Sequence, residues 1–255
     1  MNGIAVDKTR NIVVLGHASC GKTSLVEAML FRSGTSSRMG TVEAKNTVSD
    51  CLPEEQERQV SIMGSNLYLK HRDCNIFAGD TPGYADFYGD VFSAVSVADA
   101  AVVVIDASHG VEVGTRKVWR MLEKRNIPRM IVLNKMDKEN AKFTEIVAEL
   151  NESFGNGCTP IQVPIGLAET FSDAANLLLD EAGEADAELF NDLKTQLIET
   201  AVESDEEMME RYFNDEKLTR EEIIHALHKG IHNCTFFPIV LTSATKPTGI
   251  VRLLN

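Results

Sequence analysis

A glycine-rich segment near the N-terminus, GHASCGKTS at residues 16–24, constrains the fold more than any other part of the sequence. It fits the pattern G-x-x-x-x-G-K-[ST], follows the apolar run RNIVVLG, and precedes KTSLVEAMLF, whose apolar residues have helical spacing. A strand that turns through glycines into a helix presents backbone N–H groups to an anion. The segment therefore predicts a phosphate-binding loop, in which Lys22 reaches the β- and γ-phosphates and Thr23 offers its hydroxyl to Mg²⁺.

The rest of the chain alternates between apolar runs and helical patterns. VSIMGSNLYL and CNIFAGD suggest a hairpin, and helices at 86–98, 111–126 and 139–154 alternate with the strands AAVVVID, RMIVLN and TFFPIVLTSA. Continuous apolar runs between helices are typical of strands buried on both faces. We therefore predict an α/β fold with a doubly wound, mostly parallel sheet of six strands, one of them antiparallel.

Residues 159–234 interrupt this alternation. Leu189, Leu193, Leu197 and Ala201 recur every four residues, and Thr219 is placed to cap a further helix. The segment holds 18 acidic and 5 basic residues, which accounts for the whole net charge of −13. The sequence predicts a nucleotide-binding core at 1–158 and 235–255, with a mainly helical acidic insert at 159–234. Because an amphipathic helix has just begun at GIVRLLN, we expect further domains to follow.

The segment DTPG, residues 80–83, follows an apolar strand. On its own D-x-x-G is more often a plain β-turn. Next to a phosphate loop it indicates a γ-phosphate sensor, in which Asp80 binds Mg²⁺ through water and Gly83 presents its N–H to the phosphate.

The segment NKMD, residues 134–137, follows another strand at the sheet edge where ligands of such folds bind. An Asp137 carboxylate can accept two hydrogen bonds from guanine, whose donor pair adenine lacks, while Asn134 can bond N7 and Lys135 can lie along the base. The backbone N–H of Ala244 in TSAT would bond O6. These groups predict GTP and GDP as ligands; a kinase or ATPase would leave both segments without a purpose.

With these motifs in order, the chain from about Asn11 onward resembles the GTP-binding domain of elongation factor G, a translational GTPase, as a divergent paralogue. DCLPEEQERQVSI is similar to the first switch of that family, and LIETAVESDEEMMERYFNDEKLTREEI to the helical part of its inserted subdomain. The resemblance implies a P-loop NTPase G domain, with 1–158 and 235–255 as its GTP-binding core, that binds Mg²⁺ and hydrolyses GTP on the ribosome.

The resemblance also identifies departures. Ser61 stands where a Thr ligates Mg²⁺, Ser19 where the phosphate loop usually has an Asp that helps to bind a monovalent cation, and Gln59 where a Gly precedes the switch hydroxyl. Tyr84 stands where a His positions the attacking water, and a phenol is neutral at pH 7. Two functions stay open: a GTP hydrolase with Tyr84, Lys22 and Gly83 as its catalytic groups, or a GTP-binding module that docks on the ribosome with little hydrolysis.

The complete set of expected ligand-binding residues follows from these motifs. The nucleotide would contact Gly16, His17, Ala18, Ser19, Cys20, Gly21, Lys22, Thr23, Ser24, Asp80, Thr81, Pro82, Gly83, Tyr84, Asn134, Lys135, Met136, Asp137, Ser243, Ala244 and Thr245. Mg²⁺ would contact Thr23, Ser61 and Asp80.

Charge and composition bear on the partners. A net charge of −13 argues against a protein that grips nucleic acid through a basic surface. The resemblance implies the factor-binding site of the large ribosomal subunit as partner, with insert 159–234 facing the ribosomal stalk protein; otherwise the insert is an ordinary solvated surface. No apolar run is long enough to span a membrane, so we expect a cytoplasmic protein. We also expect a monomer. Five scattered cysteines indicate neither disulfides nor zinc, and His225, His228 and His232 are read as surface residues.

Overall fold

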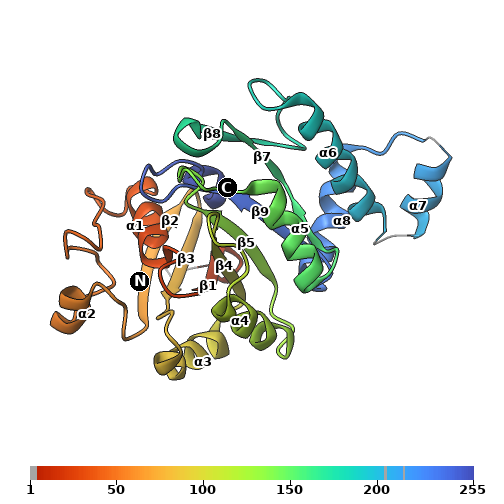
Figure 1. Ribbon diagram of the computed structural model, residues 1–255. Helices are drawn as coiled ribbons and strands as arrows, with labels where there is room; N and C mark the ends of the chain where they lie inside the picture. The colour runs from red at the N-terminus through yellow and green to blue at the C-terminus, as the bar shows by residue number, and fades with distance from the viewer. Residues whose placement is uncertain (1–4, 204–205, 215) are drawn as a thin grey trace.

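The architecture is a single large sheet with helices on both faces (Figure 1). A computed structural model describes residues 5–203, 206–214 and 216–255. The strand order is β2-β3-β1-β4-β5-β9-β6, and only β2 is antiparallel to its neighbour. The strands are β1 Thr9–Gly16, β2 Ser65–His71, β3 Cys74–Asp80, β4 Ala100–Asp106, β5 Arg129–Asn134, β6 Cys158–Pro160 and β9 Phe237–Leu241. The predicted doubly wound α/β class is therefore confirmed.

The predicted number of six strands in this sheet is wrong by one. Strand β6 pairs in parallel with β9 at the sheet edge, with Cys158 opposite Phe237. Its three residues are too few to show a periodic pattern, and Pro160 is tolerated because the strand lies at an edge. Strand β6 also crosses the position, between residues 158 and 159, at which the sequence places the start of the insert.

Nine α-helices lie in the described part of the chain, besides three short 3-10 helices. They are α1 Lys22–Arg32, α2 Pro53–Arg58, α3 Tyr88–Val97, α4 Val113–Glu123, α5 Phe143–Phe154, α6 Ala187–Val202, α7 Glu206–Phe213, α8 Arg220–His232 and α9 Ile250–Leu254. None of them is long and apolar enough to cross a bilayer.

Alternation along the strands creates two cores. Val13 and Leu15 of β1 pack with buried residues of α3, α4 and α5, whereas Val14 packs with α1 and α9 on the opposite face. Side chains of a strand point to alternate faces, so a buried parallel sheet needs helices on both sides.

The region after β6 begins with an antiparallel hairpin, β7 Gln162–Ile165 and β8 Asp173–Asn176, that the sequence does not predict. Helices α6 and α8 then pack against each other, and α7 lies at the periphery (Figure 1). Phe190, Leu197 and Leu227 of α6 and α8 belong to the same buried cluster as Leu15 of β1. His225, His228 and His232 lie exposed on α8.

Helix α8 begins at the predicted capping residue. Thr219 Oγ1 accepts the Glu222 N–H at 3.3 Å, and the Glu222 carboxylate accepts the Thr219 N–H at 2.8 Å. Hydrogen bonds from Arg211 and Thr219 lower the pKa of Glu222 to about 2. Because the pKa of Glu222 is lower in the folded chain than in the unfolded chain, its ionised carboxylate stabilises the fold above the ordinary carboxyl pKa. This stabilisation is lost as the pH falls toward 2.

Thr219→Ala is expected to lower the free energy of unfolding by about 1 kcal/mol, because the Glu222 N–H loses its acceptor. The matched control is Thr195→Ala, an exposed mid-helix threonine of α6, which we expect to change stability by less than about 0.5 kcal/mol. Urea unfolding at pH 7 measures both, and equal effects of the two changes would contradict the capping role.

Candidate nucleotide-binding site

The predicted segments meet at the carboxyl ends of β1, β3, β5 and β9. A cavity of about 350 Å³ lies there. It is lined by Ala18, Ser19, Gly21, Lys22, Thr23, Ser24, Val42, Glu43, Asp50, Gln59, Val60, Ser61, Gly83, Tyr84, Lys135, Lys138 and Thr245. This is the edge at which open α/β sheets bind their ligands.

The loop between β1 and α1 is wound around the ammonium of Lys22. Lys22 Nζ donates to the carbonyl of His17 at 2.9 Å and to that of Gly16 at 3.3 Å. Gly21 has a φ of +94°, and a Cβ there would lie 2.4 Å from Asn134 Nδ2. The turn therefore requires glycine at this position, and it places a positive charge at the helix N-terminus, where an anion is favoured.

Three oxygen-bearing side chains meet at the start of α1. Thr23 Oγ1 donates to Asp80 Oδ2 at 2.8 Å and lies 3.1 Å from Ser61 Oγ. Asp80 Oδ1 is buried without a hydrogen-bond partner in the described structure. Burial raises the pKa of Asp80 to about 6, although the Thr23 hydrogen bond and the charge of Lys22 act against this rise. An unpaired buried carboxylate oxygen beside two hydroxyls suits a hard cation such as Mg²⁺.

The turn after Asp80 packs directly on the phosphate loop. Thr81 Oγ1 donates to the carbonyl of Val14 at 2.6 Å, and Pro82 is buried. A Cβ at Gly83 would lie 2.6 Å from Lys22 Nζ and 2.7 Å from the Ala18 Cα. Only glycine fits this approach, so the backbone of residue 83 lies close to the Lys22 ammonium.

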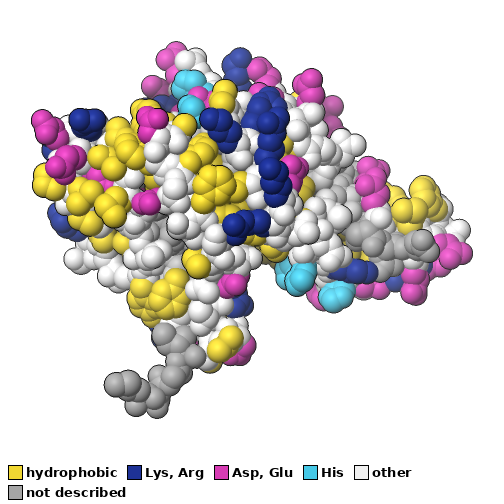
Figure 2. Space-filling model, turned by 90° about the horizontal axis from the view of Figure 1, so that it is seen from below, with side chains coloured by type: hydrophobic (Ala, Val, Ile, Leu, Met, Phe, Trp, Pro, Cys, Tyr) yellow, Lys and Arg dark blue, Asp and Glu magenta, His cyan; other side chains and the backbone are white. Residues whose placement is uncertain are grey.

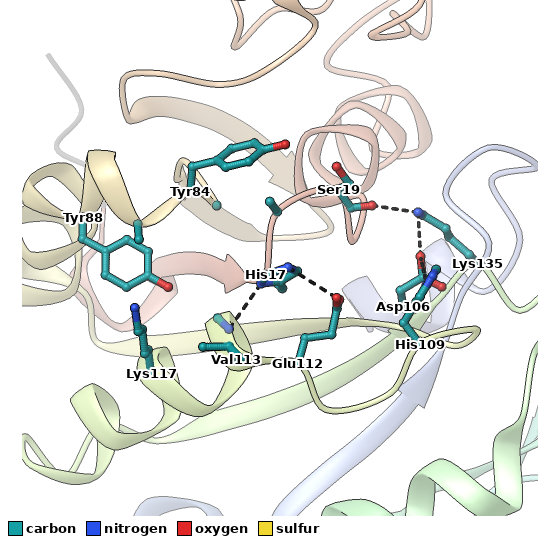
Figure 3. A pocket seen from close by; sticks show the side chains of 14 residues that line it. His17, Ser19, Tyr84, Tyr88, Asp106, His109, Glu112, Val113, Lys117 and Lys135 are labelled. Carbon is teal, nitrogen blue, oxygen red and sulfur yellow. Dashed lines mark hydrogen bonds and ion pairs between the residues drawn. The ribbon is translucent and has the colours of Figure 1, made fainter.

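Tyr84 lies at the boundary between two cavities. It lines the cavity described above and a second one of about 470 Å³ with His17, Glu112 and Val113 (Figure 3). The side chain is 43% exposed, and its hydroxyl has no hydrogen-bond partner among the described residues. In Figure 3 the phenol points away from Glu112 and Val113, toward the side on which Ser19 lies.

His17 faces the second cavity rather than the first. Its Nδ1 accepts the Gly114 N–H at 3.2 Å, and its Nε2 lies 3.3 Å from a Glu112 carboxylate oxygen (Figure 3). Since Nδ1 accepts a hydrogen bond, Nε2 carries the proton in the neutral ring. The imidazole thus connects the phosphate loop to the start of α4. Lys22 contacts His17 only through the backbone carbonyl of His17.

Asn134, at the end of β5, connects the phosphate loop to the segment that follows β9. Its side-chain oxygen accepts the backbone N–H of Ala244 at 3.0 Å and the hydroxyl of Thr242 at 3.2 Å, and its Nδ2 donates to the carbonyl of Cys20 at 3.1 Å. The N–H of Ala244 that the sequence assigns to guanine O6 therefore has a protein acceptor in this structure.

Lys135 bridges the phosphate loop and β4. Its Nζ donates to the carbonyl of Ser19 and to Asp106 Oδ2, each at 2.7 Å (Figure 3). Burial tends to raise the pKa of Asp106, but the hydrogen bonds from Lys135 and the Ser108 N–H lower it overall. Asp106, at the end of a strand, is a residue that the sequence analysis missed.

Asp137 carries the second unpaired carboxylate oxygen of the region. Its Oδ1 is buried without a hydrogen-bond partner in the described structure, and its Oδ2 lies 3.5 Å from the Thr245 hydroxyl. Such an oxygen can accept hydrogen bonds from a ligand. By contrast, the expected contact Met136 is fully buried in the core, and Ser243 is buried with its backbone paired to Thr248.

Asp50 also lies in the cavity and was missed as a site residue. It is 4% exposed, and the nearby hydroxyls of Ser61 and Thr47 favour its charged form. Burial raises its pKa. Asp50 is the first residue of DCLPEEQERQVSI, and this position in the predicted switch segment could have identified it as a site residue.

Two further buried carboxylates hold the segment from residue 40 to 63 over the cavity. Glu27 of α1 accepts the N–H groups of Gly40 and Val48. Glu55 of α2 accepts those of Leu52, Ile62 and Met63. Backbone donors that the loop leaves unpaired are therefore satisfied by two buried acids.

Gln59 ends α2 in the left-handed conformation, with φ +55°. Gln59 therefore adopts a backbone conformation that favours glycine. A side chain in this region carries a strain of about 1–2 kcal/mol.

The comparisons with known proteins agree with this geometry. The family model described as the elongation factor Tu GTP-binding domain matches residues 7–255. The crystal structure of a Thermus thermophilus protein, ttk003000868, superimposes with a TM-score of 0.89 at 30% sequence identity, over 96% of this chain. The chain spans 39% of the length of that protein. It therefore belongs to the family of the elongation factor Tu GTP-binding domain and is the G domain of a translational GTPase.

Proposed function

We propose that this G domain is of the elongation factor G type, and that it binds GTP or GDP with Mg²⁺ and hydrolyses GTP on the ribosome. The observation that carries this proposal is a pair of buried, unpaired carboxylate oxygens, Asp80 Oδ1 and Asp137 Oδ1, on residues that contact the lining of one cavity. Asp80 accepts a hydrogen bond from Thr23, at the proposed phosphate end, and Asp137 Oδ2 lies 3.5 Å from the hydroxyl of Thr245, at the proposed base end. An unpaired buried acceptor costs free energy, and a nucleotide with its metal would satisfy both.

At the phosphate end, Thr23, Ser61 and Asp80 would hold Mg²⁺, with Asp50 behind Ser61. The bound metal would supply charge neutralisation of the phosphates. The ammonium of Lys22 and the N–H of Gly83, whose backbone lies close to that ammonium, would stabilise the negative charge that develops on the γ-phosphate. Tyr84, at the rim, would orient the attacking water through its hydroxyl.

At the base end, Asp137 would accept from N1–H and the exocyclic amine of guanine. Lys135, fixed by Ser19 and Asp106, would lie along the base. Asn134 would keep one side-chain N–H for N7, since only one of its two donors has a partner among the described residues.

The partner proposal rests on charge. Residues 159–234 carry the net charge of −13, and this inserted subdomain supports an elongation factor G type rather than a Tu type. We propose that it is an inserted subdomain of the core at 1–158 and 235–255, with which it shares buried contacts, and that it faces the stalk protein at the factor-binding site of the large subunit. The protein would act as a cytoplasmic monomer.

A second candidate function is a GTP-binding module that docks on the ribosome with little hydrolysis. It is favoured by Tyr84, whose hydroxyl has no hydrogen-bond partner among the described residues and which carries a phenol in place of an imidazole.

Titration with GTP and ATP, followed by single-turnover hydrolysis with and without ribosomes, tests the proposal. We expect GTP binding, weak intrinsic hydrolysis and ribosome stimulation. Tyr84→His is expected to raise the stimulated rate by about tenfold or more, because a poised imidazole positions water better than a neutral phenol. Tyr68→His, at a similarly exposed tyrosine on β2, is the control.

Three outcomes decide between the candidates. Equal binding of ATP and GTP would overturn the guanine assignment. Hydrolysis that ribosomes do not stimulate, but that Tyr84→His restores, would establish the docking module. An unchanged stimulated rate in Tyr84→His would remove Tyr84 from the catalytic groups.

A further inference from the structure

The segment from residue 40 to 63 lies over the nucleotide cavity without a hydrophobic core of its own. All of its residues are described, and none of its apolar side chains is buried. Val48, Leu52 and Met63 are exposed, and hydrophobic side chains are visible at the left end of Figure 2, where α2 and the loops around it lie. The position of the segment therefore depends on hydrogen bonds rather than on apolar burial. Its buried side chains are polar: Thr47, Ser49, Asp50 and Glu55.

Glu27 of α1 anchors the beginning of this segment. One oxygen of its buried carboxylate accepts the N–H of Gly40 at 2.9 Å, and the other accepts the N–H of Val48. A Cβ at Gly40 would lie 2.7 Å from Glu27 Oε2 and 2.6 Å from the carbonyl oxygen of Asn46, so this approach requires glycine. Glu27 follows Thr23 by four residues, which places both side chains on one face of α1. The carboxylate thus connects the segment to the helix that carries a proposed metal ligand.

Glu55 of α2 anchors the end of the segment. Its Oε1 accepts the N–H groups of Ile62 and Met63, at 2.9 and 3.0 Å, and the side chain is buried. The residue before these two is Ser61, whose Oγ lies 3.1 Å from Thr23 Oγ1. Glu55 therefore fixes the stretch of backbone from which the Ser61 hydroxyl reaches the proposed metal site.

We propose that Glu27 and Glu55 are positioning residues of the nucleotide site, which hold residues 40–63 so that Ser61 lies beside Thr23 before nucleotide or metal binds. The inference rests on the proposed function for the identity of those ligands. Both acids bond to backbone N–H groups of the protein itself, so this arrangement does not require a γ-phosphate. Loss of a partner that orients a metal ligand typically lowers metal affinity by about 10- to 100-fold.

Titration of GTP with and without Mg²⁺ tests this role, because a residue that positions Ser61 should affect only the metal-dependent part of binding. Glu27→Gln replaces one of two acceptor oxygens with an amide group that cannot accept, so one backbone N–H loses its partner. We expect the Mg²⁺ concentration that half-maximally tightens GTP binding to rise by about 10- to 100-fold. GTP affinity in EDTA should stay unchanged. Glu55→Gln should have the same two effects.

Gly40→Ala disturbs the Glu27 contact without altering α1. Its added Cβ would displace the loop from the carboxylate, so it should raise the Mg²⁺ requirement as Glu27→Gln does. Because both changes break one contact, the double variant should be no worse than either single one. The matched controls are Glu149→Gln, which alters an acceptor of the Val111 N–H in another loop, and Gly89→Ala, where a Cβ would meet no atom within 4 Å. Both controls should leave the Mg²⁺ requirement unchanged.

Limited trypsin digestion without nucleotide or metal gives a second readout. Lys45 and Arg58 are exposed cleavage sites within the segment. Glu27→Gln should speed cleavage after Lys45 by about tenfold, since an unpaired buried N–H shifts the local opening equilibrium by about that factor. Cleavage after Lys229, an exposed site on α8, should keep its rate.

Each contrary result overturns the proposal. Variants that keep the Mg²⁺ requirement of the unmodified chain, that weaken GTP binding equally in EDTA, or that match Glu149→Gln in the digest would show that the two acids do not position the site. The digest uses no nucleotide, so it separates this proposal from the nucleotide function. Absence of GTP binding by the unmodified chain would remove that function, whereas cleavage after Lys45 would still decide whether Glu27 holds the segment.

Discussion

Asp137→Asn is expected to weaken GTP binding by at least about 10³-fold and to create binding of xanthosine triphosphate. The reason is the buried, unpaired Oδ1 of Asp137, which would accept hydrogen bonds from guanine. An asparagine amide would direct an N–H against the N1–H of guanine, whereas xanthine offers a carbonyl at that edge. A site built to hydrogen-bond one edge rejects its analogue by about 10⁴–10⁵.

Calorimetric titration with the two triphosphates measures this change. The control Asp192→Asn removes an exposed carboxylate on α6 and should leave both affinities unchanged. If Asp137→Asn bound GTP as tightly as the unmodified chain, the base end of the cavity would have to be reassigned.

Asp80→Asn is expected to have opposite effects on binding and on stability. It should abolish Mg²⁺-dependent tightening of GTP binding, because the unpaired carboxylate oxygen would become an amide group. Burial raises the pKa of Asp80 from its ordinary value of 3.8 to about 6, so its ionised form is unfavourable in the folded protein. Removal of that charge should increase the free energy of unfolding at pH 7 by up to about 3 kcal/mol.

The sign of the pH dependence follows from the same pKa. Between pH 3.8 and about 6 the unfolded chain has released the Asp80 proton and the folded chain has not, so stability without nucleotide or metal should fall as the pH rises through this window. Asp80→Asn should flatten this slope in urea unfolding measured at a series of pH values. The control Asp86→Asn, at an exposed carboxylate in the same segment, should leave it unchanged, and a slope unaffected by Asp80→Asn would show that the ionised carboxylate is not destabilising.

The regular elements of this fold were predictable because each has a pattern that spans a full strand or helix. The continuous apolar run of β1 and the capping residue Thr219 are local properties of the chain. Strand β6 and the β7–β8 hairpin were missed because a strand of three or four residues shows no period, and Pro160 and Pro164 lie within them. Such pairings are fixed by tertiary contacts with β9 rather than by local preference.

In the candidate site, too, some roles were predictable from local sequence and others were not. The roles of Lys22, Thr23 and Asp137 were predictable from the spacing of their motifs, because binding a phosphate or a base requires these residue types at those positions. The roles of Asp50, Glu27 and Glu55 depend on burial, which neither the helical pattern around Glu27 nor the acidic, aperiodic stretch around Asp50 and Glu55 reveals.

The buried cluster that joins Leu15 of β1 to Leu197 of α6 has a consequence for how this chain folds and evolves. Residues 159–234 interrupt the core in sequence, but their apolar side chains complete its packing. Excision of that segment would expose a broad apolar face of the sheet, and the remainder would aggregate rather than persist as a minimal switch. The core and residues 159–234 should therefore unfold in one cooperative transition. A partner that binds residues 159–234 would then also stabilise the nucleotide-binding core against unfolding.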